Sequence, residues 1–119
     1  VILDVDTIGA MKIRALCPDA TLIYILPPSW DELKSRLSST GIYTEEEVNA
    51  LMEIAEEEIS CANSYDYILV NDTISNTLSR FAQIIHSNRY SRNCMKEFLD
   101  SYIDGEVKPH VQSYKEALL

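Results

Sequence analysis

Residues 65–72 read Tyr-Asp-Tyr-Ile-Leu-Val-Asn-Asp, a short apolar run that ends in two polar side chains. A run of this length is typical of a strand that is covered on both faces, as strands are in parallel sheets. We therefore expect a buried strand at about residues 65–70, followed directly by Asn71 and Asp72.

Two earlier segments have the same character. Residues 1–5 are almost wholly apolar, and residues 21–26 form a second run that is halted by Pro27 and Pro28. Each segment predicts a further buried strand, because strands covered on both faces have continuous rather than alternating apolar patterns.

Helical signals separate the three expected strands. Asp6 is a good N-cap for a helix over about residues 7–16, and Ser29 is one for a short helix that ends near residue 37. Another helix is expected over about residues 73–86, with an inner face formed by Ile74, Leu78, Phe81, Ala82 and Ile85. Strands that alternate with helices predict an α/β fold with a parallel sheet and right-handed crossovers.

The longest helix is expected after Thr44, which forms a capping box with Glu47. Apolar residues then recur at helical spacing along one stripe: Val48, Leu51, Met52, Ala55 and Ile59. Residues 38–43, before this helix, have the composition of a flexible loop.

Composition excludes several classes of function. The 119 residues carry a net charge of −9, and residues 44–62 contain seven glutamates and no lysine or arginine. Nucleic-acid-binding proteins show clustered positive charge instead, so we expect no nucleic-acid or membrane partner. No apolar run approaches the roughly 18 residues of a membrane span. Three widely spaced cysteines favour free thiols in a reducing compartment, so we expect a cytoplasmic protein.

Asp4 and Asp6 close the first expected strand, and ligands of open parallel sheets bind beyond the carboxyl ends of strands. Two carboxylates there are able to hold a hydrated magnesium ion or to accept hydrogen bonds from an amino group. Equally, Asp6 would serve as a helix cap and Asp4 as a solvated strand end, and the pattern alone leaves both interpretations open.

A phosphatase of the haloacid dehalogenase type is an alternative for the same residues. Such enzymes carry D-x-D-x-T at a strand end, with the first aspartate as nucleophile. In this chain Thr7 falls one place early after Asp4 and Asp6, and Asn71-Asp72 would be the later acidic motif. No lysine between them begins a strand or helix, which argues against this class.

Three further stretches resemble the guanylate kinase family. Val1–Gly9 is similar to its V-I-L-D-V-D-x-x-G segment, and Tyr24–Ser29 with Arg36-Leu37 to its I-x-P-P-S…R-L segment. Residues 44–48 and 65–72 are similar to its T-E-E and Y-D-y-v-i-v-N-D segments. The resemblance covers about residues 1–88, in the family's order and spacing.

The resemblance implies a partial three-layer fold of the P-loop kinase type, with a lid at about residues 38–62. The family transfers the γ-phosphoryl group of ATP to GMP with Mg²⁺. Asp4 and Asp6 would lie on the GMP and magnesium side, with Asp4 contacting the metal through water. Arg36 would be the catalytic lid arginine that reaches the ATP phosphates, Asn71 would lie against the adenine, and Asp72 would lie beside it.

The chain also departs from the family pattern. Two lid arginines are replaced, one within residues 40–43 and one at Leu51, and Ile8 replaces a glutamine. The sequence contains no G-x-x-x-x-G-K-[ST] loop, and its start without Met is typical of a fragment. We therefore expect a guanylate kinase-like domain that is inactive as this chain alone. The alternative is a degenerate, pseudoenzyme module of the same lineage that binds a protein partner.

Residues 89–119 have no counterpart in the family pattern, so we expect a helical extension after a core at residues 1–88. Met95, Phe98, Leu99 and Tyr102 form one stripe on a helix over about residues 94–103, and residues 111–119 predict another short helix. Short helices gain their stability by burying such stripes, so this extension is expected to pack on the domain, on a second chain or on a protein partner.

Overall fold

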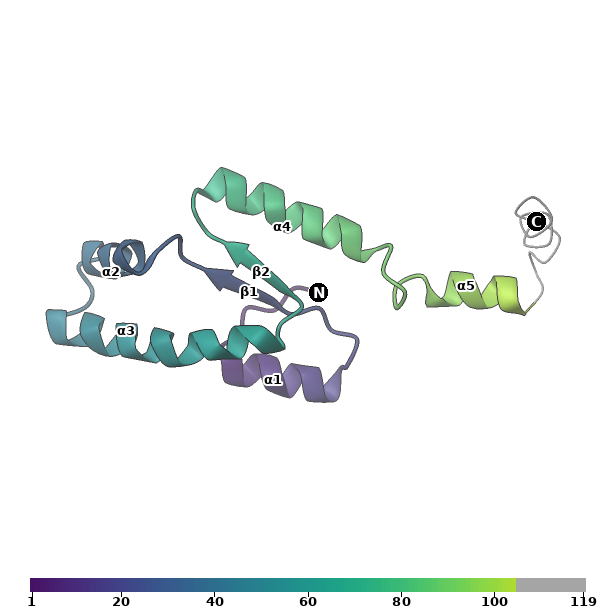
Figure 1. Ribbon diagram of the computed structural model, residues 1–119, viewed down its shortest axis with the longest axis horizontal. Coiled ribbons are helices and arrows are strands. Elements are labelled where there is room, and N and C mark those ends of the chain that lie inside the picture. The colour runs from purple at the N-terminus through teal and green to yellow at the C-terminus, as the bar shows by residue number, and fades with distance from the viewer. Residues whose placement is uncertain (105–119) are drawn as a thin grey trace. The chain divides into compact units, whose positions relative to one another are not determined.

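The computed structural model describes residues 1–104. The chain divides into two units, Val1–Phe81 and Ala82–Leu119, and the boundary falls inside the helix α4 (Ile74–Asn88). Figure 1 shows the order of the elements along the chain. The assignment of a core at residues 1–88 and an extension at residues 89–119 stays a prediction.

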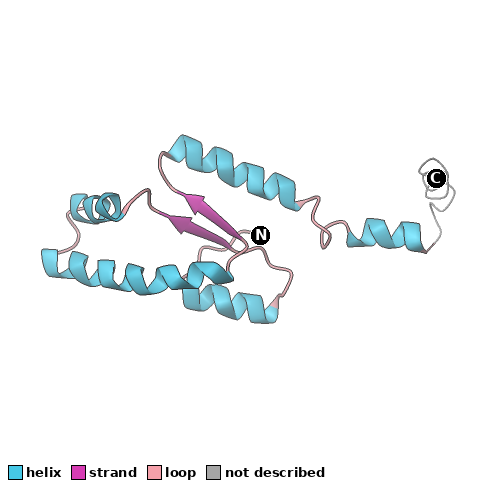
Figure 2. Cartoon of the chain, in the orientation of Figure 1, coloured by secondary structure: helices cyan, strands magenta, loops and turns pink. Residues whose placement is uncertain are grey.

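The sheet of the first unit has two parallel strands, β1 (Ile23–Leu26) and β2 (Tyr67–Val70). Ile23 lies opposite Tyr67 and Leu26 opposite Val70, so both strands end at the same edge. The connection between them consists of helices and loops and contains no further strand (Figure 2). The expected α/β fold with parallel strands and flanking helices is confirmed.

The prediction of a strand at residues 1–5 is wrong. These residues form no strand, and the side chains of Val1, Ile2 and Leu3 are 120%, 73% and 61% exposed. An apolar run indicates that side chains favour burial, but a strand also needs a neighbour for its backbone hydrogen bonds. In the described part of the chain, β1 and β2 pair only with each other.

The first two helices begin where their caps predicted. In α1 (Thr7–Leu16) the Asp6 side chain accepts a 2.7 Å hydrogen bond from the Gly9 N–H. In α2 (Trp30–Ser39) the Ser29 hydroxyl accepts one of 3.1 Å from the Glu32 N–H. Each cap satisfies a backbone donor that has no partner within its helix. Residues 38 and 39, which were expected in a loop, end α2.

The helix α3 (Glu45–Glu58) begins with the expected capping box, and η1 (Ile59–Ser64) continues it as a 3₁₀ turn. Glu47 N–H donates to Thr44 Oγ1 at 3.2 Å, and Thr44 N–H donates to Glu47 Oε2 at 2.8 Å. The helix also contacts α2. The small core is formed by Ala10, Leu22, Val48, Ala62 and Leu69.

The inner face expected for α4 is wrong in its first turns. Ile74 and Leu78 are 79% and 61% exposed, whereas Thr77 and Phe81 are half-buried. Thr77, on the packed side, makes hydrogen bonds to Asn71 and Thr73 that are described below. Hydrophobicity alone therefore misplaced the packed stripe.

The second unit contains α5 (Lys96–Ile103), close to the helix expected over residues 94–103. Phe98 and Leu99 of its apolar stripe are exposed. The helix expected at residues 111–119 lies outside the described residues. Among the described residues, no helix combines the length and the apolar character needed to cross a membrane.

Candidate functional site

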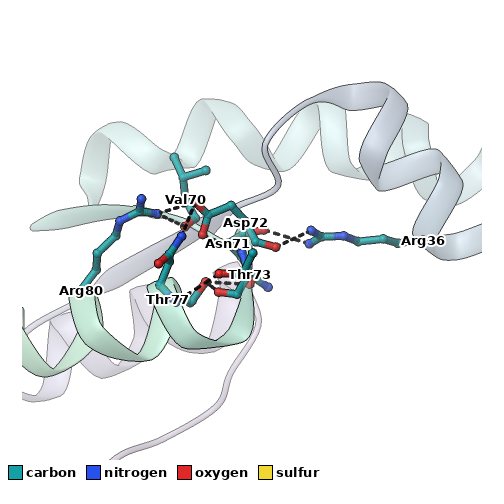
Figure 3. Close-up of polar contacts among 8 residues, drawn as sticks. Arg36, Val70, Asn71, Asp72, Thr73, Thr77 and Arg80 are labelled. Atoms are coloured by element: carbon teal, nitrogen blue, oxygen red, sulfur yellow. Dashed lines mark hydrogen bonds and ion pairs between the residues drawn. The ribbon is translucent and has the colours of Figure 1, made fainter.

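Polar contacts concentrate where β2 ends, at residues 70–73, which we call the strand-end segment (Figure 3). Three consecutive backbone carbonyl oxygens of this segment accept hydrogen bonds from two arginines. Arg80 Nη1 donates to Val70 O at 3.2 Å, and Arg36 donates to Asn71 O at 2.9 Å and to Asp72 O at 3.0 Å. The backbone of the segment is therefore held by side chains of two different helices.

Asn71 connects the strand-end segment to its surroundings. Its backbone N–H donates to Leu26 O at 2.7 Å, which extends the pairing of the two strands by one bond. Its side-chain oxygen Oδ1 lies 3.0 Å from Thr77 Oγ1, and this hydroxyl also lies 2.7 Å from Thr73 O. The backbone of Asn71 is thus fixed by a residue of the neighbouring strand, and its side chain by a residue six positions later on α4.

The Asp72 carboxylate faces the first turns of α4. Its Oδ1 accepts a 2.7 Å hydrogen bond from Thr73 N–H, and its Oδ2 lies 3.1 Å from Arg80 Nη1 and 3.5 Å from Asn76 Nδ2. The Thr73 hydrogen bond, followed by the charge of Arg80, lowers the pKa of Asp72 below its ordinary value. The carboxylate is therefore charged at neutral pH.

Arg36 reaches the strand-end segment from α2. Its Nε donates to Glu32 Oε1 at 2.8 Å, one turn earlier on the same helix, so all three guanidinium nitrogens have an acceptor. This planar group matches oxygens that lie side by side, and the Asn71 and Asp72 carbonyls are arranged in this way. An arginine so engaged connects the end of β2 to the second turn of α2.

Asp4 and Asp6 do not join this cluster. Within residues 1–104, no hydrogen bond or ion pair connects either of them to Arg36, Asn71 or Asp72. One carboxylate oxygen of Asp6 is occupied by the N-cap of α1. Among the described residues, no group of three or more His, Cys, Asp or Glu side chains is arranged to hold a metal ion.

A second cluster surrounds two tyrosines. The rings of Tyr24 and Tyr65 meet edge to face, with centroids 5.0 Å apart. Burial, followed by the charge of Glu58, raises the pKa of Tyr24, and burial followed by Cys61 raises the pKa of Tyr65. Thr7 Oγ1 donates to Glu58 Oε1 at 3.5 Å. Both phenols are neutral at physiological pH.

The sequence reasoning missed Thr77 and Arg80. A usable signal was present, because Asn76 and Arg80 are four residues apart and therefore share one face of a helix. Asp72 lies four residues before Asn76, just ahead of the helix, where a carboxylate is favoured by the helix dipole. This spacing would have predicted the contacts of Arg80 and Asn76 with Asp72.

The two positions expected to carry lid arginines lie on α3 and on the turn before it. Thr40, the exposed C-cap residue of α2, stands at the first of these positions, and Leu51 is half-buried on the inner stripe of α3. Gly41, between α2 and α3, has a φ of 67°, a backbone conformation that favours glycine.

Comparison with known proteins gives one family. The family model described as guanylate kinase matches residues 1–88. The chain is 36% identical to the guanylate kinase of Clostridium acetobutylicum over 115 residues, which cover 96% of the chain and 54% of the relative. It is 33% identical to that of Halalkalibacterium halodurans over 106 residues, which cover 89% of the chain and 52% of the relative.

The guanylate kinase of Francisella tularensis is 44% identical over 89 residues, which cover 74% of the chain and 47% of the relative. The chain thus spans about half the length of the curated relatives that it matches. None of these matches supports the phosphatase interpretation of Asp4 and Asp6.

Proposed function

The chain belongs to the guanylate kinase family, and on that basis we propose that it forms the ATP-side part and the lid of a domain that transfers the γ-phosphoryl group of ATP to GMP. One observation carries this proposal. Arg36 is bonded to the carbonyl oxygens of both Asn71 and Asp72, the two residues to which the resemblance assigns the adenine side. The three residues with an expected ATP role therefore form one cluster.

In the proposed reaction the adenine lies against Asn71, and Arg36 stabilises the charge of the ATP phosphates. Guanidinium groups favour the transition state of phosphoryl transfer because its charge is spread over several oxygens. In the present arrangement Arg36 has protein oxygens as acceptors. Its movement toward phosphates would exchange the Asn71 and Asp72 carbonyls for phosphate oxygens of higher charge.

Magnesium fits this part of the chain only as an ion that arrives with the nucleotide. Mg²⁺ commonly keeps several waters and uses one or two carboxylates together with substrate phosphates. Asp4 would contact it through water, and Asp6, with one oxygen in the α1 cap, would face the GMP side. The bound ion would neutralise charge on the phosphates.

The 119-residue chain is proposed to be inactive when it is isolated. Its sequence has no G-x-x-x-x-G-K-[ST] loop, whose backbone N–H groups and lysine bind phosphates. The lid positions within residues 40–43 and at Leu51 lack arginine, and one such residue is worth roughly 10³ or more in rate. We expect no GMP-dependent ATP hydrolysis above background.

Two measurements test this proposal. Isotope-edited NMR of the 119-residue chain with added ATP should shift the resonances of Asn71, Asp72 and the Arg36 Nε–H. A parallel assay of ADP release with GMP should stay at background. Turnover that disappears on Asp4→Ala would overturn the proposed inactivity, and absence of any shift at millimolar ATP would contradict the proposed ATP side.

A protein-binding module of the same lineage is the second candidate. The observation in its favour is the exposure of Ile42 and Tyr43, 75% and 41%, near a position where the family carries an arginine. Exposed apolar side chains favour protein contacts. If the chain binds a protein through these side chains, Ile42→Ser should weaken that binding. If the chain associates only with the remainder of a kinase domain, Ile42→Ser should leave the association unchanged.

A further inference from the structure

The strand-end segment is held from two sides by arginines that differ in their relation to the lid. Arg36 lies on α2, which leads into the lid, whereas Arg80 lies on α4, after β2. Figure 3 shows the two guanidinium groups on opposite sides of Asn71 and Asp72. Movement of the lid would therefore affect the contacts of Arg36 and leave those of Arg80 in place.

We propose that Arg80 is a positioning residue for the ATP side: it holds the backbone and the carboxylate of the strand-end segment while Arg36 engages the nucleotide. The inference rests on the proposed function only for the identity of the ligand. Arg80 Nη1 contacts both Val70 O, at 3.2 Å, and Asp72 Oδ2, at 3.1 Å. It thus fixes the residues on either side of Asn71.

The chemistry of Asp72 explains why such a residue is needed. A carboxylate next to a triphosphate site repels the ligand unless a cation is paired with it. Arg80 supplies that cation from the side opposite Arg36, and Asn76 Nδ2 adds a weaker contact at 3.5 Å. Without Arg80, the Asp72 carboxylate would be free to turn away from α4 and toward the nucleotide.

Thr73 provides a local reporter of this arrangement. Its backbone N–H donates to Asp72 Oδ1 at 2.7 Å, so its hydrogen exchange depends on the position of the carboxylate. The charged groups that face Asp72 are Arg80 on α4 and Arg36 on α2, the latter through the Asp72 backbone carbonyl. Arg36 is itself paired with Glu32, so the contribution of Arg80 is measured by comparing the NMR titration of Asp72 between variants that differ only at residue 80.

The test compares Arg80→Gln and Arg80→Lys with the unchanged 119-residue chain, and uses Arg89→Gln as a control for the loss of one positive charge. Arg80→Gln should accelerate amide hydrogen exchange at Thr73 about two- to fivefold, the range that an exposed ion pair supports. It should also raise the pH at the midpoint of the Asp72 titration. Arg80→Lys keeps the positive charge, so the midpoint pH of the Asp72 titration should stay close to that of the unchanged chain. Arg89→Gln should change neither quantity.

ATP binding gives the functional readout. Arg80→Gln should raise the dissociation constant for ATP about two- to fivefold, with Arg89→Gln unchanged. Equal ATP affinity in Arg80→Gln and the unchanged chain, or unchanged Thr73 exchange and Asp72 midpoint, would overturn the role of Arg80. If the unchanged chain binds no ATP while Arg80→Gln still alters Thr73 and Asp72, the positioning role stands and the proposed function fails.

Discussion

Arg36 Nη1 donates a 2.9 Å hydrogen bond to the backbone carbonyl oxygen of Asn71, which lies 35 residues later in the chain. Between the two residues are the end of α2, α3, η1 and β2. The contact brings together the two ends of this long segment. It therefore joins the last turn of α2 to the backbone directly after β2.

Arg36→Ala should lower the free energy of unfolding by about 1 kcal/mol, because three hydrogen bonds to a half-exposed guanidinium are lost together. Urea denaturation followed by circular dichroism measures the change. Lys34→Ala on the same helix is the matched control, with an expected change near zero. A loss of equal size in both variants would assign the effect to α2 itself rather than to the contact with Asn71.

Thr44→Ala should destabilise the chain by about 1 kcal/mol, since it removes the hydroxyl that accepts from Glu47 N–H. Thr44→Ser keeps a hydroxyl at the cap and should retain most of the stability. Thermal unfolding of the two variants provides the comparison. Equal melting temperatures for them would show that the capping box contributes nothing.

The Asp72 carboxylate should stabilise the fold in a pH-dependent way. Its folded-state pKa lies below the ordinary value of 3.8, so its contribution is fully present above that value. The contribution is lost as the pH falls through the lower, folded-state pKa. Unfolding of the unchanged chain and of Asp72→Asn, compared from pH 6 to pH 2, should show a difference that disappears in acid. A difference that is constant with pH would contradict the prediction.

Gly9→Ala should fail to stabilise α1, although alanine normally favours a helix over glycine by about 1 kcal/mol. An added Cβ would lie 2.9 Å from Asp6 Oδ1 and 3.2 Å from Val5 Cβ, so it would displace the cap. The same change in an Asp6→Ala background should be more favourable, because no capping oxygen remains to be displaced. Additive effects of the two substitutions on the unfolding free energy would refute this coupling.

Local signals in the sequence predicted much of the fold. Asp6, Ser29 and Thr44 each begin a helix, because an N-cap depends on residues only three positions away. The expected strand at residues 1–5 was wrong because pairing depends on a neighbour that no local pattern specifies. Prediction therefore succeeded where the interaction partner is close in sequence.

At the candidate site too, prediction depended on how far apart in sequence the interacting residues are. The strand pattern located the end of the strand before Asn71 and Asp72, but the ATP-side roles of these two residues and of Arg36 came only from resemblance to a family. The contact between Arg36 and Asn71 depends on how α2 and β2 are brought together, which no spacing within the sequence gives. Thr77 and Arg80 were missed because the helix was assigned by its apolar residues, and its polar face makes these contacts.

The first residue of α2 is Trp30, the single tryptophan of the chain, and its side chain is 41% exposed. Indole emission moves to longer wavelength as water gains access to the ring, and this tryptophan lies on the same helix as Arg36. The chain consequently carries an intrinsic optical probe at the first residue of α2. Changes in the position of α2, whether caused by nucleotide or by a partner, are expected to be visible as a spectral shift without any label.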